Sequence, residues 1–89
     1  MYIRKKTIRL NKIVHTRFAQ NLVNQLTIND IKSSVQIEYN GKSVNAKSII
    51  GLLSMAFVAG NDIDLILTSD IEGQVEKDLP TVLRLINEL

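Results

Sequence analysis

One histidine and a nearby arginine are the residues whose types and spacing suggest chemistry. Both lie in the segment Ile13-Val14-His15-Thr16-Arg17-Phe18-Ala19, where an alternating stretch gives way to a helical one. The first turn of a helix leaves backbone N–H groups unpaired, and the helix dipole favours negative charge there. A neutral imidazole at this position is a nucleophile that faces an anion site. The arrangement therefore suits phosphate chemistry on His15.

Basic side chains are concentrated in the same part of the chain. Residues 1–29 contain six basic residues and no acidic one, whereas five basic and nine acidic residues follow, a charge of −4. The six are Arg4, Lys5, Lys6, Arg9, Lys12 and Arg17. A basic front end suggests an acidic partner such as a phosphorylated group, a nucleic acid or an acidic protein surface. The same pattern is also typical of an ordinary solvated face.

Length and composition limit the class of protein. The 89 residues predict a single domain, residues 1–89, and the absence of cysteine excludes disulfides, iron–sulfur clusters and cysteine-based zinc sites. With only one histidine, the usual transition-metal ligands are missing, so we expect no metal and no cofactor. No apolar run approaches the ~20 residues that cross a bilayer, and no signal-peptide core is evident. We therefore expect a cytoplasmic protein with no membrane insertion.

The elements around the histidine follow from a change of period. Residues 2–10 alternate and are rich in β-branched side chains, which predicts a strand. Phe18, Leu22 and Leu26 then fall four residues apart, which predicts a helix that ends near residue 28. Either Thr16 or His15 is expected at the N-cap of this helix, and threonine is the better intrinsic cap.

A hairpin and a short helix are expected next. Residues 34–39 and 42–46 read as strands joined by Asn40-Gly41, the pair that a type I′ turn favours because both central positions need positive φ. Ser48 is a good N-cap for a second helix. We expect its buried stripe to contain Ile49, Leu52, Leu53 and Ala56, and Ile50 to lie off that stripe, exposed.

The last third predicts a strand and a final helix. Residues 62–68 alternate after a turn at Gly60-Asn61. Two interpretations remain for the C-terminal segment: a helix from about residue 70 that is kinked at Pro80, or a loop followed by a helix near Asp78. We prefer the second, in which Asp78 is the N-cap and Pro80 sits in the first turn. The order β-α-β-β-α-β-α predicts an α+β fold: an open-faced β-sandwich, with a four-stranded, mainly antiparallel sheet covered on one face by three helices.

The element order and two local signatures resemble HPr, the histidine-containing phosphocarrier of the bacterial sugar phosphotransferase system. One signature is His15-x-Arg17-x-Ala19 between the first strand and the first helix. The other runs from Tyr39 to Met55 (YNGKSVNAKSIIGLLSM) and resembles the hairpin, regulatory serine and second helix of Gram-positive members. Members usually have Gly two residues before the histidine and Pro three after it, where this chain has Ile13 and Phe18.

The resemblance implies a role for each matching residue. His15 would be phosphorylated by enzyme I and would pass the group to sugar-specific IIA domains. The backbone N–H groups of Thr16, Arg17 and Phe18 would meet the phosphoryl oxygens, and the Arg17 guanidinium would add charge-assisted bonds.

The resemblance also implies regulation and partner contacts. Ser48 matches the serine that HPr kinase/phosphorylase modifies, and its phosphorylation would slow transfer at His15 and promote binding to a catabolite control protein. The partner-binding residues would be Thr16, Phe18, Ile49, Ile50 and Leu53.

Three classes of function therefore compete: a phosphocarrier that uses His15, an HPr-like regulatory module that binds partners through the Ser48 helix, and an unrelated nucleic-acid binder. The third is the weakest, because aromatic residues are only 4% and no paired aromatic RNA-binding strand motif is present. We expect no nucleic-acid partner. An independent enzyme is also not indicated, since no nucleophile–base or acid–base spacing appears.

Overall fold

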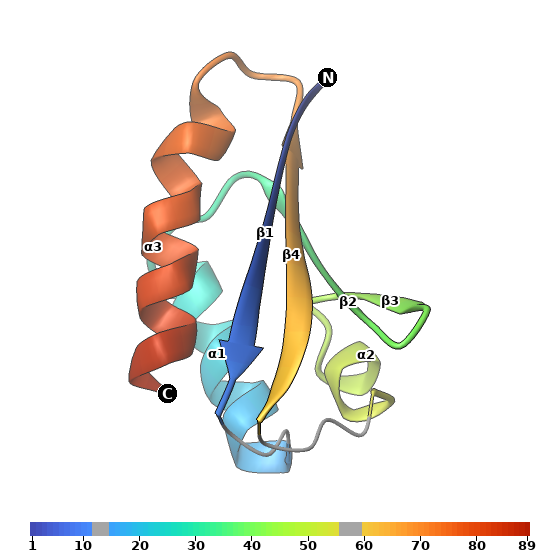
Figure 1. Cartoon of the computed structure of the whole chain (residues 1–89). Coiled ribbons are helices and arrows are strands. Elements are labelled where there is room, and N and C mark those ends of the chain that lie inside the picture. Colours follow the sequence, from blue (N-terminus) through green and yellow to red (C-terminus); the bar gives the residue numbers. More distant parts are fainter. Residues whose placement is uncertain (12–14, 56–59) are drawn as a thin grey trace.

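Four strands form one antiparallel sheet in the order β1-β4-β2-β3 (Figure 1). The computed structural model describes residues 1–11, 15–55 and 60–89. The elements are β1 (Tyr2–Leu10), α1 (Thr16–Ile28), β2 (Ser34–Tyr39), β3 (Lys42–Asn45), α2 (Ile49–Leu53), β4 (Asn61–Ser69) and α3 (Gln74–Glu88). The predicted α+β class and element order are confirmed.

The core lies between the sheet and its helices. On β4 the alternating side chains Ile63, Leu65 and Leu67 are fully buried, because every second residue of a strand points to the same face. Leu22 and Leu26 of α1 pack into the same cluster from the helix side, as their four-residue spacing predicts. The opposite face of the sheet has no helix over it in Figure 1 and carries mostly polar alternates such as Thr7, Asp62 and Asp64, together with Ile3 and Ile66.

The hairpin and the second helix follow their sequence signals closely. Asn40 and Gly41 both have positive φ, 53° and 79°, as a type I′ turn requires. β3 ends at Asn45, one residue before the expected end, and the expected turn residue Asn61 is already part of β4.

In α2 the predicted buried stripe is only partly correct. Leu52 is fully buried and Ile49 half-buried, but Leu53 is 40% exposed because this five-residue helix packs through one narrow side. Ala56 lies outside the described residues. Ile50 is 82% exposed, as expected.

The preferred interpretation of the C-terminal segment is wrong. The last helix begins at Gln74, after Gly73 with φ 81°, and Pro80 lies inside it. Proline leaves the carbonyl of Glu76 without its helical N–H donor, but both residues are exposed, so water can satisfy that group. Asp78 is not an N-cap: it is 4% exposed and points toward Ser33, in the segment before β2. Within the described ranges, no helix is long and apolar enough to cross a membrane.

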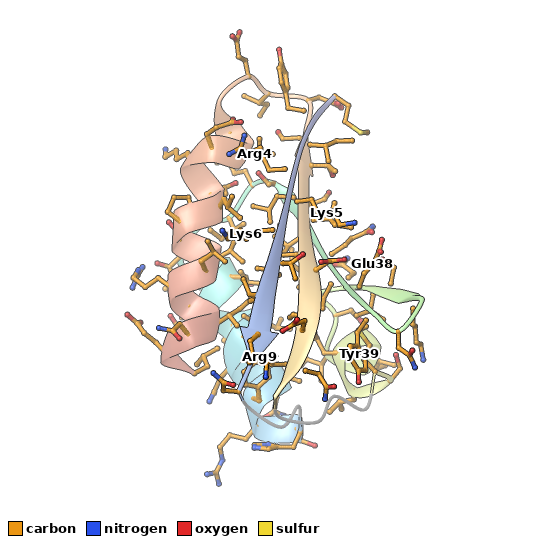
Figure 2. The ribbon with its side chains drawn as sticks, viewed as in Figure 1. Arg4, Lys5, Lys6, Arg9, Glu38 and Tyr39 are labelled. Carbon is orange, nitrogen blue, oxygen red and sulfur yellow. The ribbon has the colours of Figure 1, made fainter. Side chains whose placement is uncertain are left out.

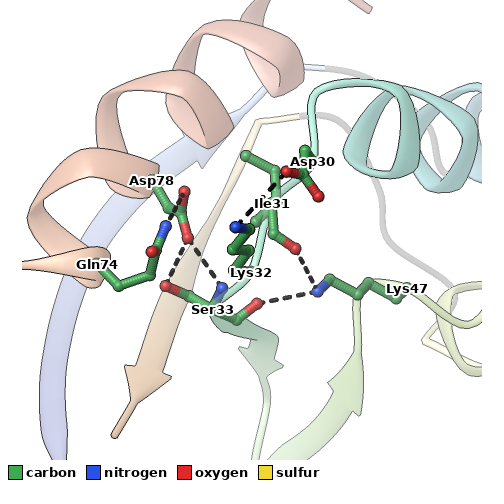
Figure 3. A network of polar contacts seen from close by, with 7 residues as sticks. All are labelled: Asp30, Ile31, Lys32, Ser33, Lys47, Gln74 and Asp78. Carbon is green, nitrogen blue, oxygen red and sulfur yellow. Dashed lines mark hydrogen bonds and ion pairs between the residues drawn. The ribbon is translucent and has the colours of Figure 1, made fainter. Parts of the chain in front are cut away.

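A buried carboxylate explains why α3 begins early. Asp78 Oδ2 accepts hydrogen bonds from the backbone N–H of Ser33 (2.8 Å) and from its hydroxyl (2.7 Å), and Gln74 donates to Oδ1 (3.0 Å; Figure 3). Lys47 Nζ donates to the carbonyls of Ile31 and Ser33 at 2.8 and 3.0 Å. The network ties α3 to the segment before β2 and to the residue that precedes Ser48.

Candidate functional site

His15 is the N-cap of α1. Its backbone is extended (φ −129°, ψ −180°), and its ring Nδ1 accepts hydrogen bonds from the backbone N–H groups of Arg17 (3.2 Å) and Phe18 (3.4 Å). The cap position left open by the sequence therefore belongs to His15, and Thr16 is the first helical residue. An imidazole can take this role because Nδ1 is bonded to Cγ, just as the capping oxygen of asparagine or aspartate is.

These hydrogen bonds assign the tautomer of the neutral ring in this conformation. An atom that accepts from two N–H groups presents a lone pair, so the neutral imidazole carries its proton on Nε2. The donor–acceptor distances of 3.2 and 3.4 Å are longer than a typical N–H···acceptor bond of about 2.9–3.0 Å. The lone pair of Nδ1 is thus oriented by the helix but held only weakly, on an exposed side chain.

Arg17 supplies an exposed positive charge two residues after His15. Its side chain is exposed, and among the residues that the structure describes it forms no ion pair. An arginine without a carboxylate partner can reach an incoming phosphate and bind it with two parallel N–H donors. Backbone and side chain of Arg17 can therefore act on the same anion.

Phe18 contributes to the site only through its backbone. Its ring is 6% exposed and packs in the core with Leu22 of the same helix. The ring therefore has almost no surface to offer a partner. Its N–H group is a second donor to Nδ1, where a proline would have none. Ile13, the other departure from the family pattern, lies outside the described residues.

Ser48 lies on a helix that packs beside α1. Its Oγ accepts from the N–H of Gly51 at 3.1 Å, which confirms it as the N-cap of α2. A Cβ at position 51 would lie 3.3 Å from both Cβ and Oγ of Ser48, so glycine leaves room for the cap. α2 and the first turn of α1 lie at the same end of the molecule (Figure 1). Thr16, Ile50 and Leu53 are all exposed there.

The basic residues of β1 divide between its two sides. Lys5 pairs with Asp64 (3.5 Å) and Arg9 with Asp62 (3.4 Å), both carboxylates on neighbouring β4. Arg4 and Lys6 lie on the side of α3 (Figure 2). The strand therefore presents a mixed surface rather than the uniform basic stripe that is typical of nucleic-acid binding. In residues 1–11, 15–55 and 60–89, no group of three His, Cys, Asp or Glu side chains could hold a metal ion.

An exposed imidazole whose Nδ1 lone pair lies beside helix N–H groups suits phosphate chemistry. Residues 3–84 match the protein family described as "PTS HPr component phosphorylation site", and the chain therefore belongs to the HPr family of the phosphotransferase system. Proteins of this family carry phosphoryl groups and are not independent catalysts, and the family implies phosphotransferase partners such as enzyme I.

Solved structures similar to this chain include HPr phosphocarriers and Crh. The phosphocarrier protein HPr from Bacillus anthracis str. Ames is 26% identical, with a TM-score of 0.77 over 93% of this chain and 95% of that one. HPr from Thermoanaerobacter tengcongensis is also 26% identical, with a TM-score of 0.67 over 97% and 98%. Crh, the catabolite repression HPr of Bacillus subtilis, is 33% identical, with a TM-score of 0.69 over 91% and 87%. Both carriers and Crh thus resemble the chain.

Sequence reasoning missed the polar network that ties α3 to the segment before β2. Asp78 and Ser33 are 45 positions apart, and no local spacing pairs them. The available signal was an acidic residue between the apolar Val75 and Val82 of α3, which is where a buried carboxylate would need a partner.

Proposed function

We propose that this chain is a phosphocarrier that relays a phosphoryl group on His15 from enzyme I to sugar-specific IIA components of the phosphotransferase system. The observation that supports this most directly is the orientation of His15: an unprotonated Nδ1 faces the N–H groups of Arg17 and Phe18 at the N-terminus of α1.

The proposed transfer needs no proton to leave the attacking atom. The Nδ1 lone pair attacks phosphorus. The N–P bond forms as the bond between phosphorus and the atom of enzyme I that carried it breaks, and Nε2 keeps its proton. The N–H groups that now solvate the lone pair then donate to phosphoryl oxygens, and the Arg17 guanidinium balances their charge. Transfer to the IIA acceptor reverses these steps.

The strength of this anion site suits a relay. A helix N-terminus at an exposed position stabilises an anion by only about 0.3–1 kcal/mol. The phosphohistidine is therefore favoured without becoming a trap, so the group remains available to the next protein.

We further propose that HPr kinase/phosphorylase modifies Ser48 and that the modified protein binds a catabolite control protein. Phosphate adds about −1.5 to −2 charge beside the N-terminal N–H groups of α2, where negative charge is favoured. Exposed Ile50 and Leu53 next to Ser48, with Thr16 of α1, offer an apolar and polar contact surface. Half-buried Ile49 would support that surface from below.

A second candidate is a regulatory module that uses the Ser48 helix and does not carry sugar-transport phosphate. It is favoured by the likeness to Crh, at 33% identity, and by the 82% exposure of Ile50.

Incubation with enzyme I and phosphoenolpyruvate, followed by intact mass and acid-lability measurements, separates the two candidates. The carrier proposal expects one acid-labile phosphoryl group that is lost in His15→Asn, a variant that keeps a capping side chain and hence the helix. No labelling by a competent enzyme I, together with acid-stable labelling of Ser48 by the kinase, would favour the regulatory module.

A further inference from the structure

β1 is an edge strand of nine residues. Among the described strands, β4 is its neighbour in the sheet and none lies on its other side (Figure 1). In an antiparallel pair every second residue turns its backbone N–H and C=O groups away from the neighbouring strand, so the outer edge of β1 offers donors and acceptors for a further strand. Residues 2–7 are all exposed, and burial begins only at Ile8 and Leu10. The edge is therefore open over most of its length.

The same strand is strongly basic. It carries four positive charges, on Arg4, Lys5, Lys6 and Arg9, and contains no acidic residue. Successive side chains of a strand point to opposite faces, so the four charges are shared between the two faces of the sheet. On the helix-free face, Lys5 and Arg9 each have a carboxylate of β4 beside them.

Arg4 and Lys6 lie on the α3 side and have no such neighbour. Their partner positions on β4 are Leu67 and Leu65, which are fully buried. Within the part of the chain that the structure describes, neither cation forms an ion pair. Figure 2 shows both between β1 and α3. These two charges are therefore available to a carboxylate from another molecule.

The charges decide which strand can pair with this edge. A second copy of β1 would bring four further cations, and like charges that lie opposite each other destabilise a sheet. Inward-facing charges on an edge strand protect it in the same way against pairing with itself. An acidic strand has the complementary charge, as β4 shows on the inner edge of β1, where two aspartates pair with Lys5 and Arg9.

The outer edge of β1 is separate from the candidate functional site. Figure 1 shows the first turn of α1 near the end of β1 that carries the arrowhead, and Figure 2 shows Arg4 and Lys6 farther back along the strand. A segment bound there leaves His15 and Ser48 accessible, so the inference does not depend on the proposed function.

We propose that the outer edge of β1, over residues 3–7, binds an extended acidic segment of a partner protein as a fifth strand of the sheet. Backbone hydrogen bonds hold the segment, and carboxylates on its alternate residues pair with Arg4 and Lys6.

Two capped peptides test the proposal on the full chain. One alternates glutamate with threonine over the length of β1, and the other has glutamine in place of each glutamate. In ¹H–¹⁵N NMR titrations we expect the glutamate peptide to shift the amides of residues 3–7. We also expect it to slow hydrogen exchange at every second one of them, because a paired edge shields its outward N–H groups. The glutamine peptide should bind at least about fivefold more weakly.

Charge-removing variants locate the contact. Arg4→Gln and Lys6→Gln are each expected to weaken binding of the glutamate peptide about two- to fivefold. Lys42→Gln is the matched control, because it removes the same charge from β3, the strand at the other edge of the sheet, and it is expected to leave binding unchanged. Thermal unfolding of all three variants checks that the fold is intact.

The proposal is overturned if neither peptide binds, if both bind equally, or if the shifts lie outside β1. Binding that leaves the hydrogen exchange of β1 unchanged would also overturn it, since the peptide would then be attracted without pairing as a strand. Equal losses of binding in Lys42→Gln and Arg4→Gln would show that net charge attracts the peptide. Protection of the same amides by raised protein concentration alone would place a second copy on the edge and contradict the proposal.

Discussion

Replacing the buried Asp78 with alanine is expected to lower the free energy of unfolding by about 3–5 kcal/mol at pH 7. Asp78 is 4% exposed and Ser33 is fully buried, so water cannot replace the bonds between them. The perturbation therefore tests whether the network in Figure 3 holds α3 to the segment before β2.

The magnitude follows from the individual bonds. Asp78 receives two hydrogen bonds from Ser33, at 2.8 and 2.7 Å, and one from half-exposed Gln74 at 3.0 Å. Hydrogen bonds to a charged group contribute about 1.5–3 kcal/mol each, so the two bonds from buried Ser33 together contribute about 3–6 kcal/mol. Gln74 can turn to water and the Ser33 hydroxyl can rotate, so we expect a loss of about 3–5 kcal/mol, toward the lower part of that range.

Lowering the pH should reduce the contribution of Asp78 to the free energy of unfolding. Burial raises the pKa of the Asp78 carboxyl, but hydrogen bonds from the side chain and backbone of Ser33, with help from Gln74 and the backbone of Lys32, outweigh it and hold the pKa below its ordinary value. A depressed folded-state pKa contributes stability above the unfolded pKa of about 3.9, and that stability is lost as the pH falls through the folded value. The difference in free energy of unfolding between wild type and Asp78→Asn should therefore decrease as the pH falls through that range.

Urea denaturation followed by far-ultraviolet circular dichroism, at pH 7 and at steps down to pH 3, measures both effects. Glu72→Ala, an exposed acid outside the helices, is the control and should change stability by less than about 0.5 kcal/mol. The reasoning would be refuted if Asp78→Ala lowered the free energy of unfolding by less than about 1 kcal/mol at pH 7. It would also be refuted if the difference in free energy of unfolding between wild type and Asp78→Asn did not change with pH.

Three further variants probe the site and its neighbours. Phe18→Pro removes an N–H donor near His15, so its phosphohistidine should hydrolyse about 2–10-fold faster than that of Phe18→Val, which keeps the N–H; equal half-lives would show that this donor does not contact the phosphate. Gly41→Ala, at φ 79° with open space around it, should cost about 1–2 kcal/mol in urea denaturation, and no loss would mean that the turn changes type. Ile50→Ser should leave stability within about 0.5 kcal/mol but weaken binding of the Ser48-phosphorylated protein to its control protein; unchanged binding would place the contact elsewhere.

Local patterns were sufficient for most of the fold. The strands could be predicted because a period of two leaves one buried face, and the hairpin because Asn40-Gly41 tolerates positive φ at both positions. The start of α3 could not be predicted, because it depends on a hydrogen bond between Asp78 and Ser33, 45 positions apart, and on Pro80 facing water.

The sequence predicts His15 as the nucleophile, and that role stays a prediction. General cap preferences favour Thr16 as the N-cap, and only the backbone geometry assigns the cap to the histidine. Likewise, the helical period places Leu53 on the predicted buried stripe of α2. It cannot show that this short helix packs through too narrow a side to bury Leu53. The side on which a short helix packs is decided by the rest of the fold.

The most direct test of the central claim is the ring nitrogen that carries phosphorus. The protein, labelled with ¹⁵N-histidine, would be treated with enzyme I and phosphoenolpyruvate and observed by ¹⁵N and ³¹P NMR. The proposed relay predicts phosphorus on Nδ1 of His15, with the group discharged on addition of a IIA acceptor. Phosphorus on Nε2, or no phosphohistidine with a competent enzyme I, would contradict it.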